Sequence, residues 1–179
     1  MRENPLARRV AKPDVGQRCF IALGANLGDP VRTVTAAIAA LHDLPQTEFV
    51  AASSLYRTAP VGLKHQPDFI NAVVALDTRL GPHELLDELF ALEARFGRVR
   101  EPGSVKNAPR TLDLDLLLHG DSVLNDPTLI LPHPRMHERA FVLAPLAEIA
   151  PNLIVPGRGP IADLLAACAG QRIHLLTRP

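Results

Sequence analysis

Two aspartates interrupt a leucine-rich segment of this chain. Asp113 and Asp115 stand in the run Arg110-Thr111-Leu112-Asp113-Leu114-Asp115-Leu116-Leu117-Leu118. Side chains two residues apart on a strand share a face, so this spacing predicts both carboxylates on one face and the leucines at 112, 114 and 116 on the other. Carboxylates offer only oxygen ligands, which hard cations such as magnesium prefer. Magnesium held by one or two carboxylates keeps positions for water and substrate phosphates, so the segment predicts a magnesium site for phosphate chemistry.

Basic residues crowd the irregular stretch before these aspartates. They are Arg95, Arg98, Arg100, Lys106 and Arg110. Arginine binds phosphate with a planar, bidentate fork and neutralises the charge that develops when a phosphoryl group is transferred. The alternative is a hairpin with a solvated loop, in which the arginines simply pair with the aspartates. Spacing alone leaves both interpretations open.

Phe69 and Asn71 follow a long connection, residues 59–68, that contains two prolines and a glycine. Connections of this length in compact domains are often functional. The aromatic ring could stack on a flat heterocycle, and the amide could hydrogen-bond to the edge of that heterocycle. The alternative is a phenylalanine in the core and an asparagine that satisfies a strand end.

Other recognisable patterns give weaker or negative signals. His133 and His137 have a spacing found in zinc sites, but Pro134 between them disfavours a shared helical face and no third ligand is evident. The run Gly24-Ala25-Asn26-Leu27-Gly28 lacks the Gly-Lys-Ser/Thr ending of a phosphate-binding P-loop and the third glycine of the dinucleotide pattern. We interpret it as a tight strand-to-helix turn. No serine or cysteine lies in a nucleophile elbow, so nothing favours covalent catalysis.

The elements that position these residues follow from hydrophobic periodicity and turn residues. Strands are predicted at 19–23, 50–58, 69–76 and 110–118. A first helix is predicted from the cap Asp29 and the first-turn Pro30 as far as Pro45, and a second from Pro82 to Gly97. Two further helices are predicted at 138–149, with an interruption at Pro145, and at 161–169. The order strand-helix-strand-strand-helix-strand, followed by a helical tail, predicts an α+β fold. We expect a ferredoxin-like, mostly antiparallel sheet with helices packed on its faces.

Length and composition restrict the class of protein. The 179 residues fit one domain, and we expect residues 1–17, which are polar and basic, to form a flexible tail before a domain at 18–179. Lys+Arg and Asp+Glu balance at 19 each, which argues against a nucleic-acid-binding protein that depends on a bulk positive field. Cys19 and Cys168 each lie in an apolar run and predict buried thiols in a reducing compartment. The absence of a membrane-spanning run and of a secretory signal predicts a cytoplasmic protein.

With these residues in view, the chain closely resembles the 6-hydroxymethyl-7,8-dihydropterin pyrophosphokinase family of folate biosynthesis. The resemblance extends from about Cys19 to about Pro151, in the family's order and near its spacing, and Pro109-Arg110-Thr111-Leu112-Asp113-Leu114-Asp115 is the family's signature. The other motifs that carry it are Ala22 to Gly28, Ser53 to Thr58, Gln66 to Ala72, Gly97 to Arg100, and Pro132 to Met136.

This resemblance implies an ATP-dependent pyrophosphokinase that transfers the pyrophosphoryl group of ATP to the pterin hydroxymethyl oxygen and releases AMP. It implies two Mg²⁺ ions held by Asp113 and Asp115, and catalytic roles for these aspartates together with Arg98 and Arg110. Positions that match the family's pterin contacts are Thr58, Ala59, Val61, Phe69, Asn71 and Phe141. Positions that match its ATP contacts are Glu93, Arg100, Leu116 and His133. ATP and hydroxymethyl-dihydropterin would be the binding partners of a monomer, with no nucleic acid or membrane partner.

Two other functions stay open at this point. A two-metal phosphodiesterase or nuclease would use the same acids, since hydrolysis and transfer share their electrostatics, although the neutral net charge and the aromatic and amide pair argue against it. A catalytically silent pterin- or nucleotide-binding module is disfavoured by the retention of both aspartates and both loop arginines. The loop between Gly97 and Pro109 is expected to close over ATP and exclude water, and the sequence does not indicate which of its residues seals the pterin.

Overall fold

The structure, a computed structural model, describes residues 16–60, 65–99 and 109–177. The predicted tail lies outside the described residues except for its last two positions, and Gln17 already belongs to the first strand. Val61, Arg100 and most of the loop between Gly97 and Pro109 also lie outside the described residues.

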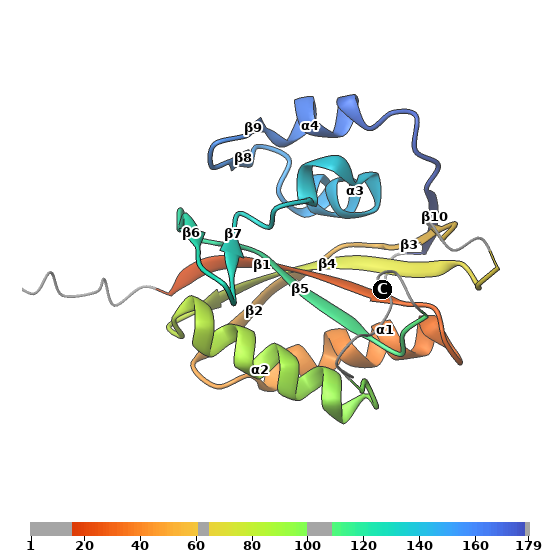
Figure 1. Ribbon diagram of the computed structural model, residues 1–179, viewed down its shortest axis with the longest axis horizontal. Coiled ribbons are helices and arrows are strands. Elements are labelled where there is room, and N and C mark those ends of the chain that lie inside the picture. The colour runs from red at the N-terminus through yellow and green to blue at the C-terminus, as the bar shows by residue number, and fades with distance from the viewer. Residues whose placement is uncertain (1–15, 61–64, 100–108, 178–179) are drawn as a thin grey trace, which may run out of the picture.

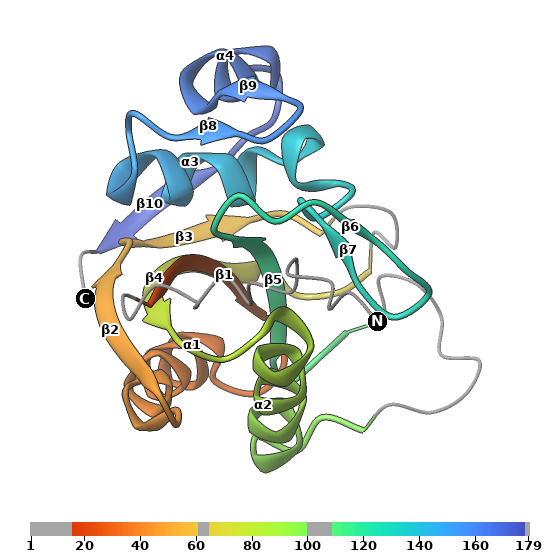
Figure 2. The same cartoon turned by 90° about the vertical axis from the view of Figure 1, so that its left-hand side faces the viewer.

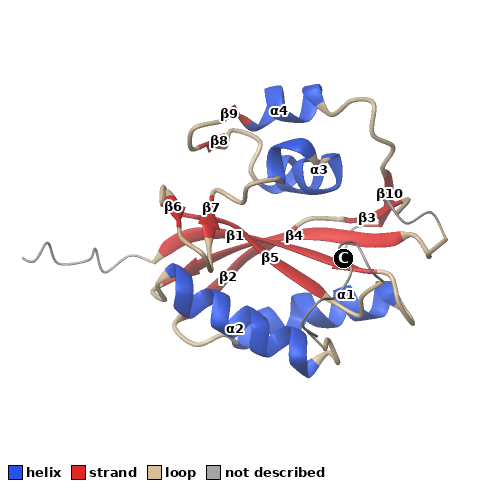
Figure 3. Ribbon diagram, in the orientation of Figure 1, coloured by secondary structure: helices blue, strands red, loops and turns tan. Residues whose placement is uncertain are grey.

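The described residues form four α-helices, two 3₁₀ turns and ten strands (Figure 3). The helices are α1 (Pro30–Ala40), α2 (Pro82–Arg95), α3 (Ala140–Ile149) and α4 (Ile161–Ala167), and the 3₁₀ turns are η1 (Leu41–Asp43) and η2 (Met136–Glu138). The main sheet contains β1 (Gln17–Ala25), β2 (Thr47–Ala52), β3 (Leu55–Thr58), β4 (Phe69–Thr78), β5 (Asp113–His119) and β10 (His174–Thr177). Two small hairpins pair β6 (Leu124–Asn125) with β7 (Ile130–Leu131), and β8 (Ile154–Val155) with β9 (Gly159–Pro160).

The main sheet has the order β10-β3-β4-β1-β5, and β2 pairs with the other half of β4. Every pairing is antiparallel. Each central strand thus has a neighbour that is distant in sequence, which is the connectivity of the ferredoxin-like motif. The predicted α+β class and antiparallel sheet are confirmed.

Helices cover both faces of this sheet. Figures 1 and 2 show α1 and α2 on one side and α3, with α4 beyond it, on the other. The apolar residues of β1 alternate accordingly: Cys19, Ile21 and Leu23 belong to the core under α1 and α2, whereas Phe20 and Ala22 belong to the core under α3. The residues of β5 and Leu112 just before it alternate in the same way, because Leu112, Leu114 and Leu116 join the core under α1 and α2 and leave the two aspartates on the α3 side. This confirms the facing predicted from their spacing.

The predicted strand over residues 50–58 is wrong as a single element, because Ser53 and Ser54 divide it into β2 and β3. Ser53 still bonds to β4, donating its amide to Val73 O and accepting the Val73 amide at Oγ. Ser54 instead turns toward α3, where its amide and hydroxyl both donate to the Glu148 carboxylate. The Tyr56 hydroxyl donates to the same carboxylate at 2.7 Å. A side-chain acceptor on α3 thus replaces the strand partner and ties α3 to β3.

The C-terminal region is less helical than the sequence predicts. Pro145 lies inside α3 without ending it, and α3 begins at Ala140 after a 3₁₀ turn. The last helix ends at Ala167, and residues 174–177 return to the sheet as β10, which pairs with β3. Residues 174–177 carry no clear period-2 signal, so their strand conformation depends on long-range pairing. No helix among the described residues is both long enough and apolar enough to cross a membrane.

Candidate active site

Small residues leave an opening on the α3 side of the sheet. Gly24 of β1 is paired with Asp113 of β5 on one side and with Asn71 of β4 on the other. Ala22 is the corresponding partner of Asp115. Because paired residues of neighbouring strands project to the same face, a glycine and an alanine separate the carboxylates from Asn71. A Cβ at Gly24 would approach Asn71 Oδ1 to 3.3 Å, so the absent side chain keeps this space open.

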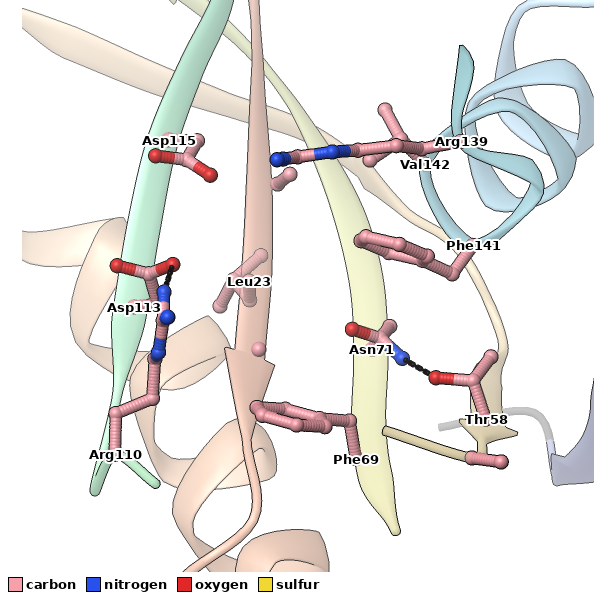
Figure 4. Close-up of a pocket in the computed structure, with 13 residues that line it drawn as sticks. Leu23, Thr58, Phe69, Asn71, Arg110, Asp113, Asp115, Arg139, Phe141 and Val142 are labelled. Carbon is pink, nitrogen blue, oxygen red and sulfur yellow. Dashed lines mark hydrogen bonds and ion pairs between the residues drawn. The ribbon is translucent and has the colours of Figure 1, made fainter. Parts of the chain in front are cut away.

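The first cavity occupies this opening, with a volume of about 690 Å³ that includes its open mouth. Figure 4 shows Phe69 and Phe141 on opposite sides of Asn71, with their rings facing each other across the cavity. Asn71 is buried, and its Nδ2 donates to Thr58 Oγ1 at 2.9 Å, which fixes the amide orientation. Ala59 completes this wall. Two rings and a fixed amide are suited to a flat heterocycle with donors and acceptors on its edge.

The second cavity, of about 1060 Å³ with its open mouth, lies on the other side of the aspartates. Its apolar lining comes from α2, β5 and the β6–β7 hairpin, namely Leu86, Phe90, Leu116, Leu129 and Ile130. His133 lies in its wall, and its amide donates to Leu117 O of β5 at 2.9 Å. His133 Nδ1 accepts the Arg135 amide, and burial lowers the pKa of His133 to about 4. The ring is therefore neutral at pH 7 and carries its proton on Nε2, which can donate to a ligand.

Four charged residues line both cavities: Arg110, Asp113, Asp115 and Arg139. Asp113 is held by two arginines, with Arg98 Nη1 at 2.7 Å from Oδ1 and Arg110 Nη1 at 2.5 Å from Oδ2. The Asp115 carboxylate accepts no hydrogen bond and makes no ion pair with any described residue. Figure 4 shows Arg139 extending from the start of α3 over Phe141 toward Asp115. The two cavities thus meet at two acids and two arginines.

The environment of Asp115 favours its protonated form. Burial, and then the charge of Asp113, raise the pKa of Asp115 to about 7. A divalent cation between the two carboxylates would remove this penalty, because it replaces repulsion between like charges with attraction to both. Two carboxylates that share a face, next to space for phosphates and water, are the donor set that magnesium uses in nucleotide sites. Among the described residues, no group of three or more His, Cys, Asp or Glu side chains is placed to hold a metal ion.

This raised pKa gives the metal-free protein a characteristic pH dependence. The folded state binds the Asp115 proton more tightly than the unfolded state, whose pKa is near 3.8, so the contribution of Asp115 to stability falls as the pH rises from about 4 to about 7. The pKa of His133 is lower in the folded state than in the unfolded state, so the contribution of His133 to stability increases as the pH rises from about 4 to about 6.5. We therefore expect Asp115→Asn to raise the melting temperature relative to the wild type by several degrees at pH 8, and by much less at pH 5.

Thermal melts in chelator across this pH range measure that difference. Asp77→Asn is the matched control, since Asp77 is ion-paired with Arg18 at the surface. Its difference from the wild type should not grow between pH 5 and pH 8. A difference for Asp115→Asn that is the same at both pH values would contradict the assignment of a raised pKa to Asp115.

The structure brings most of the predicted site residues together. Thr58, Ala59, Phe69, Asn71 and Phe141 line the first cavity, and Arg98, Leu116 and His133 line the second. Arg110, Asp113 and Asp115 line both. Val61 and Arg100 lie outside the described residues. Glu93 is the exception: it is buried beneath β5 and lines neither cavity.

The site also contains residues that were not predicted from the sequence, among them Arg139 and Asn26. Arg139 lines both cavities, and its guanidinium lies 5.6 Å from the centre of the Phe141 ring. Asn26 is buried and joins three segments: its Oδ1 accepts the Arg110 amide, and its Nδ2 donates to Gln66 Oε1 and Pro67 O. Asn26 thereby positions both Arg110 and the strand that begins at Phe69. The available signal for Arg139 was its position two residues before Phe141, and the available signal for Asn26 was its place in the motif Ala22 to Gly28.

Comparison with known proteins identifies relatives of this chain. Residues 20–151 match the family described as 7,8-dihydro-6-hydroxymethylpterin-pyrophosphokinase. The 2-amino-4-hydroxy-6-hydroxymethyldihydropteridine pyrophosphokinase of Pseudomonas aeruginosa is 48% identical over 160 residues, which cover 89% of this chain and 97% of that protein. The proteins of the same name from Haemophilus influenzae and Bacillus subtilis are 42% and 46% identical, covering 86% and 73% of this chain and 94% and 76% of those proteins.

Solved structures show the same fold. The Plasmodium falciparum HPPK-DHPS with pteroate superposes with a TM-score of 0.66 at 12% identity, covering 88% of this chain and 43% of that chain. An HPPK-DHPS in complex with substrates gives the same TM-score and identity and covers 86% of this chain and 43% of its own. This chain thus spans less than half the length of these solved chains. The resemblance found in the sequence motifs is confirmed, and the chain belongs to the 7,8-dihydro-6-hydroxymethylpterin-pyrophosphokinase family.

Proposed function

We infer that this protein transfers the pyrophosphoryl group of ATP to the hydroxymethyl oxygen of 6-hydroxymethyl-7,8-dihydropterin, producing AMP and the pterin pyrophosphate for folate biosynthesis. The names of its relatives support the reaction class. The observation that carries the assignment of substrates is the pair of cavities that share Arg110, Asp113, Asp115 and Arg139. A bisubstrate transfer requires two ligands whose reacting atoms meet at one charged junction.

The first cavity is the proposed pterin site. A pterin ring between Phe69 and Phe141 would bury both of its faces, and the Asn71 amide, fixed by Thr58, would hydrogen-bond to its edge. The hydroxymethyl group would then point toward the aspartates. Asn71→Ala should therefore weaken pterin binding more than nucleotide binding, because Asn71 lies in the first cavity alone.

The second cavity is the proposed ATP site. Its apolar wall of Phe90, Leu116 and Leu129 suits the base, and the Nε2–H of His133 together with Arg98 suits the phosphates. With the triphosphate extending toward the junction, the β-phosphorus would lie next to the pterin hydroxyl. The hydroxyl oxygen forms a bond to the β-phosphorus and loses its proton to solvent, the bond from that phosphorus to the α,β-bridging oxygen breaks, and AMP departs with the electron pair.

Asp113 and Asp115 are the proposed magnesium ligands. Bound magnesium would neutralise phosphate charge and strengthen the electrophilic character of the β-phosphorus. Asp113 is held by Arg98 and Arg110 in the structure. When Mg–ATP binds, these arginines can exchange the carboxylate for phosphate oxygens, which also present paired acceptors to a guanidinium. Asp113 would thus have a cationic partner both before and after the nucleotide enters, first the arginines and then the magnesium.

Product analysis tests this function. Purified protein with ATP, Mg²⁺ and hydroxymethyl-dihydropterin should produce AMP and pterin pyrophosphate in equal amounts. Formation of ADP, or no turnover, would contradict the pyrophosphokinase assignment. AMP released without pterin would instead indicate the phosphodiesterase alternative, and binding of both ligands without turnover would indicate a silent binding module. The cytoplasmic location and the monomeric state remain predictions, which fractionation and sedimentation can check.

A further inference from the structure

A buried carboxylate on α2 contacts the strand that carries both aspartates. Glu93 is 1% exposed, and its Oε1 accepts the backbone amide of Leu114 at 2.7 Å. Leu114 is the residue between Asp113 and Asp115, so this bond attaches to the backbone at the centre of the acidic pair. Glu93 itself lines neither cavity, although its helix α2 (Figure 1) also supplies Leu86 and Phe90 to the wall of the second cavity.

The position of β5 in the sheet explains why such an acceptor is needed. β5 is an edge strand whose single partner in the described sheet is β1, so alternate amides of β5 point outward without a ladder partner. Glu93 provides the acceptor that a further strand would otherwise supply at Leu114. Burying a carboxylate costs free energy unless its oxygens are hydrogen-bonded, so an apolar residue at this position would stabilise the core more than an unpaired glutamate would.

Glu93 also contacts an arginine of the site. Its Oε2 lies 3.8 Å from Arg98 Nε, and its backbone carbonyl accepts the Arg98 amide at 3.1 Å. The far end of the same guanidinium donates to Leu112 O at 3.0 Å and to Asp113 Oδ1 at 2.7 Å. The Glu93 carboxylate therefore contacts both the backbone between the two acids and the arginine that holds one of them.

We propose that Glu93 is a positioning residue for the metal and phosphate site. It holds β5 and Arg98 in the register that presents Asp113 and Asp115 to one cation, and it makes no contact with the nucleotide. This proposal rests on the function proposed above in one respect, that Asp113 and Asp115 bind magnesium. It replaces the expectation from family resemblance that Glu93 contacts ATP.

Two substitutions of Glu93 distinguish a positioning role from direct contact with the nucleotide. Glu93→Ala removes the contacts of the carboxylate with Leu114 and Arg98, whereas Glu93→Gln keeps an oxygen acceptor for Leu114 and loses the charge opposite Arg98. In Glu93→Ala we expect faster hydrogen exchange of the Leu114 amide and a fall of about 10–100-fold in Mg²⁺-dependent affinity for a nonhydrolysable ATP analogue. In Glu93→Gln we expect Leu114 to stay protected and the Mg²⁺-dependent affinity to fall less. Affinity for AMP in chelator should equal that of the wild type in both variants.

Asp87→Asn, an exposed change on the same helix, is the matched control and should match the wild type in every measurement. Weakened AMP binding in both variants would overturn the proposal, because it would place Glu93 in contact with the nucleotide. Unchanged Leu114 exchange in Glu93→Ala would also overturn it. If Glu93→Ala does not fold, the test depends on Glu93→Gln. Mg²⁺-dependent affinity and turnover equal to those of the wild type in Glu93→Gln would then refute the proposal. Exchange and binding need no pterin turnover, so a wild-type protein that makes no AMP would refute the proposed function without affecting these readouts.

Discussion

Asp115→Asn is expected to lower the rate of AMP formation by about 10²–10³-fold while leaving the fold intact. The amide is nearly the same size as the carboxylate, but it removes one of the two negative charges that the proposed magnesium site offers. The Asp115 carboxylate makes no hydrogen bond or ion pair with another described residue, so the change breaks no direct side-chain contact. Since burial and Asp113 raise the pKa of Asp115, the same change should increase stability at pH 8. Loss of activity with a gain in stability is the signature of a residue kept for function.

Steady-state rates at several Mg²⁺ concentrations, combined with melting temperatures, test this expectation. The wild type should saturate with Mg²⁺ at concentrations where Asp115→Asn does not. Asp77→Asn is again the control, because Asp77 lies at the far end of the sheet in an ion pair with Arg18. If Asp115→Asn melts far below the wild type but keeps normal activity per folded molecule, Asp115 is a structural residue and the metal assignment fails.

Arg110→Ala is expected to lower kcat by about 10²–10³-fold without weakening Mg²⁺ binding. The Arg110 backbone is held independently of its side chain, because its amide donates to Asn26 Oδ1 and its carbonyl accepts the Asn26 amide. Truncation therefore removes the guanidinium and leaves the loop end in place. Asp113 keeps its bond to Arg98, and loss of one competing cation should make Asp113 at least as available to a metal.

Arg110→Lys separates charge from geometry. Lysine restores the positive charge but lacks the planar fork that grips two phosphate oxygens, so we expect it to recover only part of kcat and to stay about tenfold or more below the wild type. Arg18→Ala, which removes an exposed arginine ion-paired at the surface, should have wild-type rates. Full recovery by lysine would show that Arg110 supplies charge alone, and a parallel loss of Mg²⁺ affinity in Arg110→Ala would show that it positions Asp113 instead.

Much of the fold was predictable because its signals are local. The period-2 alternation around Asp113 and Asp115 predicted which residues of β5 enter the core, and the structure confirms it. Asp29 was predicted to cap the first helix, and its side chain accepts the Arg32 amide at 3.0 Å. These features depend on neighbours within a few residues, where backbone geometry alone decides which side chains share a face or reach an amide.

The errors arose where distant contacts decide the local structure. Ser53 and Ser54 fall in an apolar run that predicts one continuous strand, but the Glu148 carboxylate, far along the chain on α3, provides the bonds that divide it. Residues 174–177 form a strand only because the edge of β3 is free to pair with them. No window of neighbouring residues contains such information.

The candidate site, like the fold, was predictable in its local features and unpredictable in its long-range contacts. The residue types by themselves determined the chemistry: two carboxylates on one face of a strand, arginines beside them, and an aromatic ring near an amide. Only the tertiary structure decided how these groups meet. It placed Gly24 and Ala22 between the acids and Asn71, brought Arg139 to the junction of two cavities, and left Glu93 outside both cavity linings, where it accepts the Leu114 amide. The physical reason is that alternation assigns a side chain to a face of its own strand, whereas the pairing of strands and the packing of helices determine which side chains from remote segments meet there.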